Sequence, residues 1–363
     1  MKLQVTQENL AKALNTVARV ANGRSTLPIL SNVILKTVGT RLSIAATNLD
    51  IAITCLVGSK VSSEGAITVP ARLMQDFVSS LPSGIITLSL EEHKLHISTD
   101  KYQSVINGIS AEDFPVMPAI TKGKNWSVPA KALKAGLQQV VIAASNDEAR
   151  PTLTGIYIHS FGAKLFAVAT DSYRLAEKEL IKTNEEVDLL VPASAMNDLL
   201  RITADFDGDV HITHDDQQIL FKIGDDQLVT RLIEGKYPDY RKLIPQKFNT
   251  TVSLKRTDFV NITKVSSLFA RESAGSITIN VDEAKSLVSI QSVASQLGEN
   301  TASATAKVTG EGEITLNSRY LLDALNVLSD DDVTFSFNGK LEPCILKGNK
   351  TTDYTHVIMP LKS

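Results

Sequence analysis

The strongest constraint in this sequence is an internal repeat. Three segments share the order of a strand, an amphipathic helix, a turn and a second strand, and they start 122 and 125 residues apart. They are ITVPARLMQDFVSSLPSGIITLSL from Ile67, LLVPASAMNDLLRITADFDGDVHI from Leu189 and ITLNSRYLLDALNVLSDDDVTFSF from Ile314. Similarity at a regular spacing indicates homologous structural units.

Other landmarks follow the same spacing. Pro28 and Pro151 are 123 residues apart, as are Thr47 and Thr170. Each third of the chain also ends in a similar segment: DFPVMP from Asp113, YPDYRKLIP from Tyr237 and VIMPLKS from Val357. The sequence therefore predicts three domains, over residues 1–120, 121–246 and 247–363.

Hydrophobic periodicity predicts an α+β fold for each domain. In the first domain, apolar residues recur at helical spacing over 7–20 and 72–81. Alternating or β-rich runs predict eight strands, at 3–6, 33–38, 42–47, 51–57, 66–69, 85–90, 94–99 and 103–109. Such a unit is expected to pack its helices on one side and its sheets on the other.

The first helix of each domain is basic, whereas the second is neutral. The first helices, 7–24, 130–145 and 255–272, each carry a net charge of +2. The second helices, 71–81, 193–203 and 318–328, each contain one Arg and one Asp. The helices total +6 in a chain of net charge −3, so the rest carries −9. This distribution suits helices that face a polyanion; ordinary solvated helix faces are the alternative.

An arginine lies at the end of the first helix, or in the loop that follows it, in every repeat. These residues are Arg24, Arg150 and Arg271. A cation at a helix C-terminus complements the helix dipole, but its recurrence favours contact with phosphate. Asp147 and Glu148 stand close to Arg150 and weaken that interpretation for the second repeat.

The segment ATDSYRLA, from Ala169, resembles an active site because it concentrates polar side chains. Its partner in the first repeat is AATNLDIA, from Ala45. The shared Thr-Asx pair between two strands is typical of a turn, because a short polar side chain bonds its own backbone. What is particular to the second repeat is Tyr173, Arg174 and Leu175, a combination suited to recognition. An enzyme that uses Asp171 with Tyr173 and Arg174 remains an alternative, although no nucleophile or cofactor motif accompanies these residues.

Metal and cofactor motifs are not expected. His93 and His96 are three residues apart on a predicted strand, as are His211 and His214. The two side chains of each pair therefore point to opposite faces of their strand. The segment DFDGDVHITHDD lacks the glycine and glutamate positions of a calcium loop. No phosphate loop, dinucleotide fingerprint or nucleophile elbow occurs. We therefore predict no metal, no cofactor and no catalytic residue.

The composition favours a cytoplasmic protein. Cys55 and Cys344 each lie in an apolar run and are interpreted as buried thiols of a reducing compartment. The N-terminal segment MKLQVTQENL has no apolar signal-peptide core. No apolar run approaches the ~18 residues of a membrane span, so no membrane association is expected.

Over its whole length the chain resembles the bacterial sliding clamp, the β subunit of DNA polymerase III. The resemblance rests on GRSTLPILSNVIL, ITVPAR, RPTLTGIY, ATDSYRLA, YPDYRKLIP and the terminal VIMPLK. It implies a ring of two chains and six domains, with helices lining a hole for duplex DNA. It implies no catalysis, because the ring tethers polymerase to its template by topology and must contact DNA independently of sequence.

The resemblance also implies partners and site residues. The partners would be a second copy of the chain, double-stranded DNA, the polymerase III α subunit, the clamp loader, and other polymerases and repair proteins with clamp-binding motifs. Contacts with DNA are expected from Arg24, Arg72 and Arg150, and dimer contacts from Ile106, Leu268 and Phe269. The expected peptide-binding pocket comprises Leu153, Thr170, Tyr173, Arg174, Leu175, Pro238, Lys242, Leu243, Val357, Met359, Pro360 and Leu361.

One further function class stays open. A repeat scaffold could bind proteins but not DNA, and it would then form no ring and show no dependence on closed versus linear DNA. The sequence alone leaves this alternative to experiment.

Overall fold

The structure is a computed structural model that describes residues 1–21, 27–120, 122–294 and 298–362. By internal contacts the chain divides into two compact units. Unit 1 comprises Met1–Lys131 with Ser194–Leu232, and unit 2 comprises Ala132–Ala193 with Ile233–Ser363. Each unit is considered by itself.

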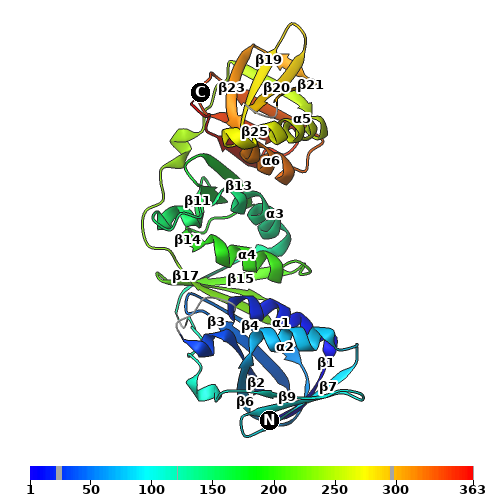
Figure 1. Ribbon diagram of the computed structural model, residues 1–363. Helices are drawn as coiled ribbons and strands as arrows, with labels where there is room; N and C mark the ends of the chain where they lie inside the picture. The colour runs from blue at the N-terminus through cyan, green and yellow to red at the C-terminus, as the bar shows by residue number, and fades with distance from the viewer. Residues whose placement is uncertain (22–26, 121, 295–297, 363) are drawn as a thin grey trace. The chain divides into compact units, whose positions relative to one another are not determined.

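Unit 1 contains two antiparallel sheets, the packed helices α1 (Gln7–Ala21) and α2 (Ala71–Ser80), and all of α4 (Ala193–Ile202) except its first residue (Figure 1). The five-stranded sheet has the order β5 (Lys60–Ser63), β1 (Lys2–Thr6), β7 (Ile85–Glu91), β8 (Lys94–Ser98) and β9 (Gln103–Asn107). The eight-stranded sheet has the order β10 (Lys124–Pro129), β15 (Asp209–His214), β16 (Gln218–Ile223), β17 (Asp226–Arg231), β4 (Ile51–Gly58), β3 (Arg41–Thr47), β2 (Asn32–Val38) and β6 (Ala66–Pro70).

Unit 2 repeats this plan with a nine-stranded and a four-stranded sheet. The larger sheet has the order β14 (Asp188–Pro192), β11 (Gly155–Phe161), β12 (Lys164–Thr170), β13 (Arg174–Lys182), β26 (Tyr354–Ile358), β25 (Cys344–Gly348), β24 (Asp332–Phe337), β18 (Thr250–Lys255) and β22 (Lys307–Thr309). The smaller has the order β21 (Gly298–Thr305), β20 (Leu287–Ala294), β19 (Ser276–Asp282) and β23 (Gly312–Asn317).

Two antiparallel seams join strands from successive repeats. In unit 1, β17 pairs with β4, with Leu228 opposite Ile53. In unit 2, β26 pairs with β13, with Val357 opposite Leu175. Each seam therefore places the end of one repeat beside the Thr-Asx turn of the repeat before it.

The predicted helices are present, and their apolar faces explain them. In α1, Leu10, Leu14 and Val17 form one fully buried stripe against the strands. In unit 2, α5 (Arg256–Phe269) packs against α6 (Ser318–Val327). Asn317 caps α6 by accepting a 2.9 Å hydrogen bond from the Arg319 backbone N–H.

Some element boundaries differ from the predictions. The helix predicted over 130–145 ends earlier, because α3 (Ala130–Val140) is followed by a 3₁₀ turn at Val141–Ala143. The short edge strand β5 was not predicted, since its sequence KVSS lacks an apolar alternation and is largely exposed. The second helix of the second repeat, α4 (Ala193–Ile202), ends before a turn that leads into β15, which confirms the turn interpretation of DFDGDVHITHDD.

A candidate protein-docking site

The Thr170–Arg174 segment forms a tight turn between β12 and β13. The Thr170 hydroxyl donates to the Arg174 carbonyl over 2.6 Å. Asp171 Oδ1 accepts from the backbone N–H groups of Tyr173 and Arg174, each at 2.9 Å. Ser172 takes a left-handed φ of 78°. The turn aims the side chain of Tyr173 outward.

The corresponding turn in unit 1 has the same geometry. The Thr47 hydroxyl donates to the Ile51 carbonyl at 3.0 Å, and Asn48 Oδ1 accepts from the N–H groups of Asp50 and Ile51 at 3.1 and 2.8 Å. Leu49 has a φ of 79°, matching Ser172. The prediction that the Thr-Asx pair is turn chemistry is confirmed.

Arg174 lies inside the wall of the candidate site and is already paired. Its side chain is 9% exposed, and its Nε and Nη1 contact Asp171 Oδ2 at 3.1 Å and Asp323 Oδ2 at 2.6 Å. Its guanidinium also lies over the ring of Tyr320, 4.5 Å from the centroid. Arg174 therefore ties β13 to α6, whereas the sequence grouped it with Tyr173 and Leu175 as a recognition residue.

The C-terminal segment packs beside this turn. The Met359 N–H donates to the Tyr173 carbonyl and the Leu361 N–H to the Thr315 carbonyl, both at 2.8 Å. Met359, Pro360 and Leu361 are half-buried, whereas Tyr173 is 58% exposed. The structure therefore brings the tail residues of the expected pocket next to Tyr173.

A buried apolar cluster supports the site from below. Leu175 and Val357 face each other across the β13–β26 seam and belong to this cluster. Tyr237 enters it from the segment that leads into the third repeat, and its ring stacks on Tyr157 at 4.8 Å between centroids. The remaining buried members are Phe166, Val168, Leu190, Tyr240 and Ile345. The cluster holds three separate segments in one place.

A buried polar network anchors the segment that carries Lys242 and Leu243. The Tyr240 hydroxyl donates to Glu177 Oε2, and His159 Nε2 lies 2.8 Å from the same hydroxyl. Since the phenol proton is given to Glu177, His159 Nε2 is the donor to Tyr240. Burial and the nearby Arg241 lower the pKa of His159 to about 4, so the imidazole is neutral at pH 7.

Arg241 completes this anchor. Its Nη2 lies 3.2 Å from Glu177 Oε2, and its guanidinium lies over the ring of Phe161 at 4.2 Å and that of Phe166 at 4.7 Å from the centroids. Sequence reasoning missed Glu177, Tyr240 and Arg241 as supports of the site. The only available signal was the polar and aromatic content of YPDYRKLIP.

The other predicted pocket residues vary in accessibility. Leu153, on the 3₁₀ turn Pro151–Thr154, is buried, and Thr170 is also buried. Pro238, Lys242 and Leu243 are exposed, and Lys242 forms a 2.7 Å ion pair with Asp239.

Both cysteines are buried free thiols, as predicted. Cys344 lies on β25, and burial raises the pKa of its thiol to about 12.

Arg150 lies near the turn of the candidate site. Its Nε forms a 2.9 Å ion pair with Asp147, and its Nη1 donates to the Ser172 hydroxyl at 2.9 Å. The acidic neighbour noticed in the sequence is therefore a direct partner of Arg150. A contact of Arg150 with DNA stays a prediction.

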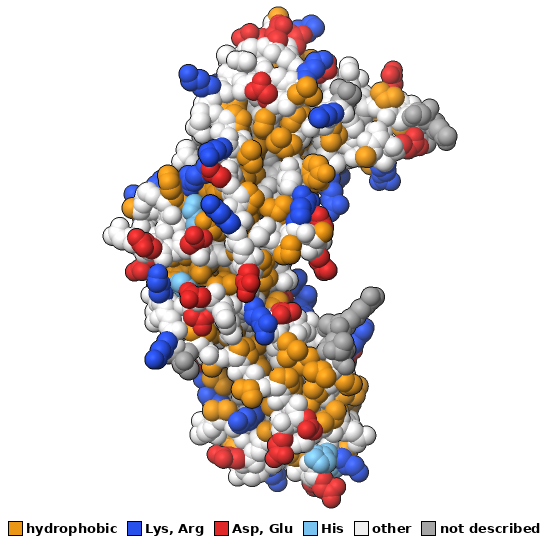
Figure 2. Space-filling view, turned by 90° about the vertical axis from the view of Figure 1, so that its left-hand side faces the viewer, with side chains coloured by type: hydrophobic (Ala, Val, Ile, Leu, Met, Phe, Trp, Pro, Cys, Tyr) orange, Lys and Arg blue, Asp and Glu red, His pale blue; other side chains and the backbone are white. Residues whose placement is uncertain are grey.

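The two other arginines expected to contact DNA are in unit 1. Arg24 lies outside the described residues. Arg72, on α2, is 83% exposed and its Nε is 3.9 Å from Asp76. Such an exposed pair contributes little to stability, so the Arg72 side chain is available to other ligands. On the face that Figure 2 shows, basic and acidic side chains are interspersed.

The residues expected at the dimer contact lie on or near exposed sheet edges and helix ends. Ile106 is on β9, an edge strand of the five-stranded sheet, but its side chain is only 5% exposed because it faces the core of unit 1. Its neighbour Val105 faces outward. Leu268, at the end of α5, is 50% exposed and Phe269 is half-buried.

Within the described part of the chain, no group of three or more metal-ligating side chains occurs. Among the same residues, no helix is both long and apolar enough to cross a membrane.

Comparison with known proteins identifies the family to which the chain belongs. Three family models match in order: the N-terminal domain of the DNA polymerase III beta subunit over residues 1–118, the central domain over 127–239 and the C-terminal domain over 241–362. A beta sliding clamp from Synechocystis is 31% identical, with 100% of this chain and 99% of that relative covered. The chain belongs to the DNA polymerase III β subunit family, the sliding clamps.

Solved structures agree with this membership. A DnaN sliding clamp (DNA polymerase III subunit beta) from Pseudomonas aeruginosa, bound to griselimycin, has a TM-score of 0.94 and 28% identity over all of both chains. A DNA polymerase sliding clamp from Bacillus subtilis has a TM-score of 0.94 and 26% identity, with 100% of this chain and 99% of that chain covered. The predicted fold of three clamp domains is confirmed, and the chain is a sliding clamp, not an enzyme.

Proposed function

We propose that two copies of this clamp form a six-domain ring that encircles duplex DNA and tethers polymerases to it. Three successive domains, with boundaries near 120 and 246, would supply half of the ring. The observation that carries the proposal is the recurrence of a basic first helix: Lys12 and Arg19 on α1, Lys131 and Lys134 on α3, Arg256 and Lys264 on α5.

Contacts with DNA would be electrostatic and independent of base sequence. Each first helix presents only a few cations, and α2, α4 and α6 balance one Arg with one Asp. Weak phosphate contacts of this kind hold a ring near the duplex axis without stopping it from sliding. Arg72, with Arg24 and Arg150, would add to them.

The site around Tyr173 would bind short linear motifs of the polymerase III α subunit, the clamp loader and other polymerases or repair proteins. Exposed Tyr173 and Leu243 offer apolar contacts, and the tail residues Met359–Leu361 offer an adaptable edge. These contacts lie above a rigid buried cluster, which favours preorganised binding.

A topological tether predicts a specific dependence on DNA shape. Clamps loaded by a clamp loader with ATP should remain on a nicked circle and be lost rapidly when a restriction enzyme linearises it. The measurement is the lifetime of labelled clamp on each form by gel filtration. Equal lifetimes on circular and linear DNA would instead support a scaffold that does not encircle DNA.

Dimerisation should depend on the end of α5. We expect Leu268→Ala combined with Phe269→Ala to give a folded monomer, because it removes apolar area that an edge-to-edge contact with a second chain would bury. Sedimentation at low micromolar concentration measures the mass, and circular dichroism checks the fold. Val265→Ala, which truncates another exposed residue of α5, serves as the control. A double variant that stays dimeric would reassign the contact.

A further inference from the structure

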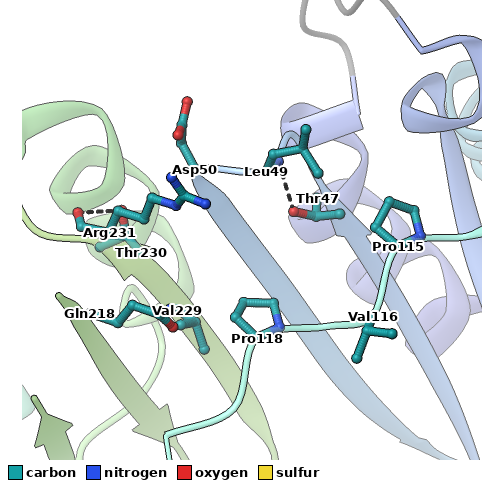
Figure 3. Close-up of a pocket in the computed structure, with 10 residues that line it drawn as sticks. All are labelled: Thr47, Leu49, Asp50, Pro115, Val116, Pro118, Gln218, Val229, Thr230 and Arg231. Carbon is teal, nitrogen blue, oxygen red and sulfur yellow. Dashed lines mark hydrogen bonds between the residues drawn. The ribbon is translucent and has the colours of Figure 1, made fainter.

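Unit 1 contains a surface hollow of about 220 Å³ that the proposed function does not use. Figure 3 shows its walls. Leu49 and Asp50 come from the turn before β4, Val229 and Arg231 from the end of β17, and Pro115 and Val116 from the segment that crosses the opposite side. All of these residues belong to unit 1.

The hollow is the repeat equivalent of the docking site in unit 2. The Arg231 N–H donates to the Asp50 carbonyl at 3.1 Å, just as the Met359 N–H donates to the Tyr173 carbonyl at 2.8 Å. The strand registers agree as well: Thr230 lies opposite Ile51, as Ile358 lies opposite Arg174. One backbone frame therefore occurs twice in the chain.

The segment that contains Pro115 and Val116 also resembles its counterpart around Pro238 in unit 2. Phe114 is buried and anchors the segment in unit 1, as the buried Tyr237 does in unit 2. A proline follows each anchor, Pro115 and Pro238. Beyond Pro115, Val116 is 96% exposed. The backbone arrangement thus places the exposed apolar side chain of Val116 beside the hollow.

The side chains on this frame define a different chemistry from that of unit 2. Leu49, Pro115, Val116, Pro118 and Val229 are apolar. Arg231 is exposed, and its guanidinium has no hydrogen-bond or ion-pair partner among the described residues. In Figure 3 it extends from β17 toward the turn at Asp50. A planar guanidinium at an apolar rim is suited to a carboxylate, which it can bind through two hydrogen bonds.

These dimensions and charges disfavour two other classes of ligand. Pockets for small molecules usually exceed about 300 Å³, so the hollow has room for one or two side chains only. Nucleic acid requires several cations, whereas here Arg231 is accompanied by Asp50. Asp50 also disfavours a second acidic group on the ligand.

We propose that this hollow is a second docking site, for an extended peptide segment that inserts one aliphatic side chain and places a neighbouring carboxylate on Arg231. The aliphatic side chain fills the space between Leu49, Val116 and Val229. The carboxylate comes from an Asp or Glu next to it in the segment. This extends the proposed function from one site for linear motifs to two sites of different specificity.

The probe is the capped peptide Ac-Gly-Ala-Leu-Asp-Ala-NH2 titrated into the full-length dimer with ¹³C-labelled methyl groups. We expect saturable shifts in the methyl signals of Leu49, Val116 and Val229 at millimolar peptide. Arg231→Glu should weaken binding at least about fivefold, because an exposed charge pair contributes up to about 1 kcal/mol and reversal adds repulsion. The Asn analogue of the peptide should bind the unaltered clamp correspondingly more weakly.

Matched measurements separate this proposal from the proposed function. Lys242→Glu alters an exposed cation at the first site and should leave the Leu-Asp peptide unaffected, whereas Arg231→Glu should leave binding of a Gln-Leu-x-Leu-Phe peptide unaffected. Val116→Ser, at a fully solvated position, should weaken only the Leu-Asp peptide. The proposal is overturned if no methyl signal of these three residues shifts, if the Asn peptide binds equally well, or if the shifts report a second clamp chain seated on the hollow.

Discussion

Removal of Met359–Ser363 should weaken binding of a Gln-Leu-x-Leu-Phe peptide at least about 30-fold, the equivalent of about 2 kcal/mol for hot-spot contacts. The removed residues belong to the proposed docking site around Tyr173. Met359, Pro360 and Leu361 are half-buried, and backbone bonds to Tyr173 and Thr315 hold Met359 and Leu361, so these three residues contribute a preformed surface rather than a loose tail. Fluorescence anisotropy of a labelled peptide measures the change.

A shorter truncation provides the control. Lys362 is exposed, and the two backbone bonds of the tail are made by Met359 and Leu361. Removing only Lys362 and Ser363 should therefore leave peptide affinity within about twofold, because Met359–Leu361 and their two bonds are kept. Both truncated variants should remain dimers and should keep the thermal unfolding midpoint of the full chain. If the longer truncation stays dimeric and binds the peptide as tightly as the full chain, the docking site has been misplaced.

The sequence predicted the repeat, the helices and the docking turn because each depends on short-range patterns. The stripe of Leu10, Leu14 and Val17 appears at helical spacing, and it is the buried face of α1. The pairing of Thr170 with Asp171 specifies a turn through side chains that bond their own backbone. Such information is contained within a few consecutive residues.

The supports of the site could not be predicted in the same way, because their partners are distant in sequence. Asp323 is 149 residues from Arg174, and Glu177 is 63 residues from Tyr240. No local pattern shows that Arg174 is buried. The end of α3 was also misplaced, since the apolar run continues past Val140 into the 3₁₀ turn.

Arg174→Ala should lower the free energy of unfolding by about 2–4 kcal/mol, the largest effect we expect from one substitution. Removing one member of a buried ion pair typically costs about 3–5 kcal/mol, because the other charge remains without its partner. Here the side chains of Asp171 and Asp323 are 14% and 33% exposed, so water compensates part of the loss. The stacking on Tyr320 is lost as well.

Arg150→Ala is the matched comparison. It also removes an arginine paired with an aspartate three residues away, but its side chain is 45% exposed, so the cost should stay below about 1 kcal/mol. Urea unfolding at one fixed clamp concentration compares the variants, since dimerisation would otherwise change the apparent stability. In Arg174→Met with Asp323→Leu, apolar packing replaces one ion pair and should recover part of the loss. If Arg174→Ala costs no more than Arg150→Ala, the buried ion pairs do not stabilise the wall, and Arg174 is free to act on a bound peptide instead.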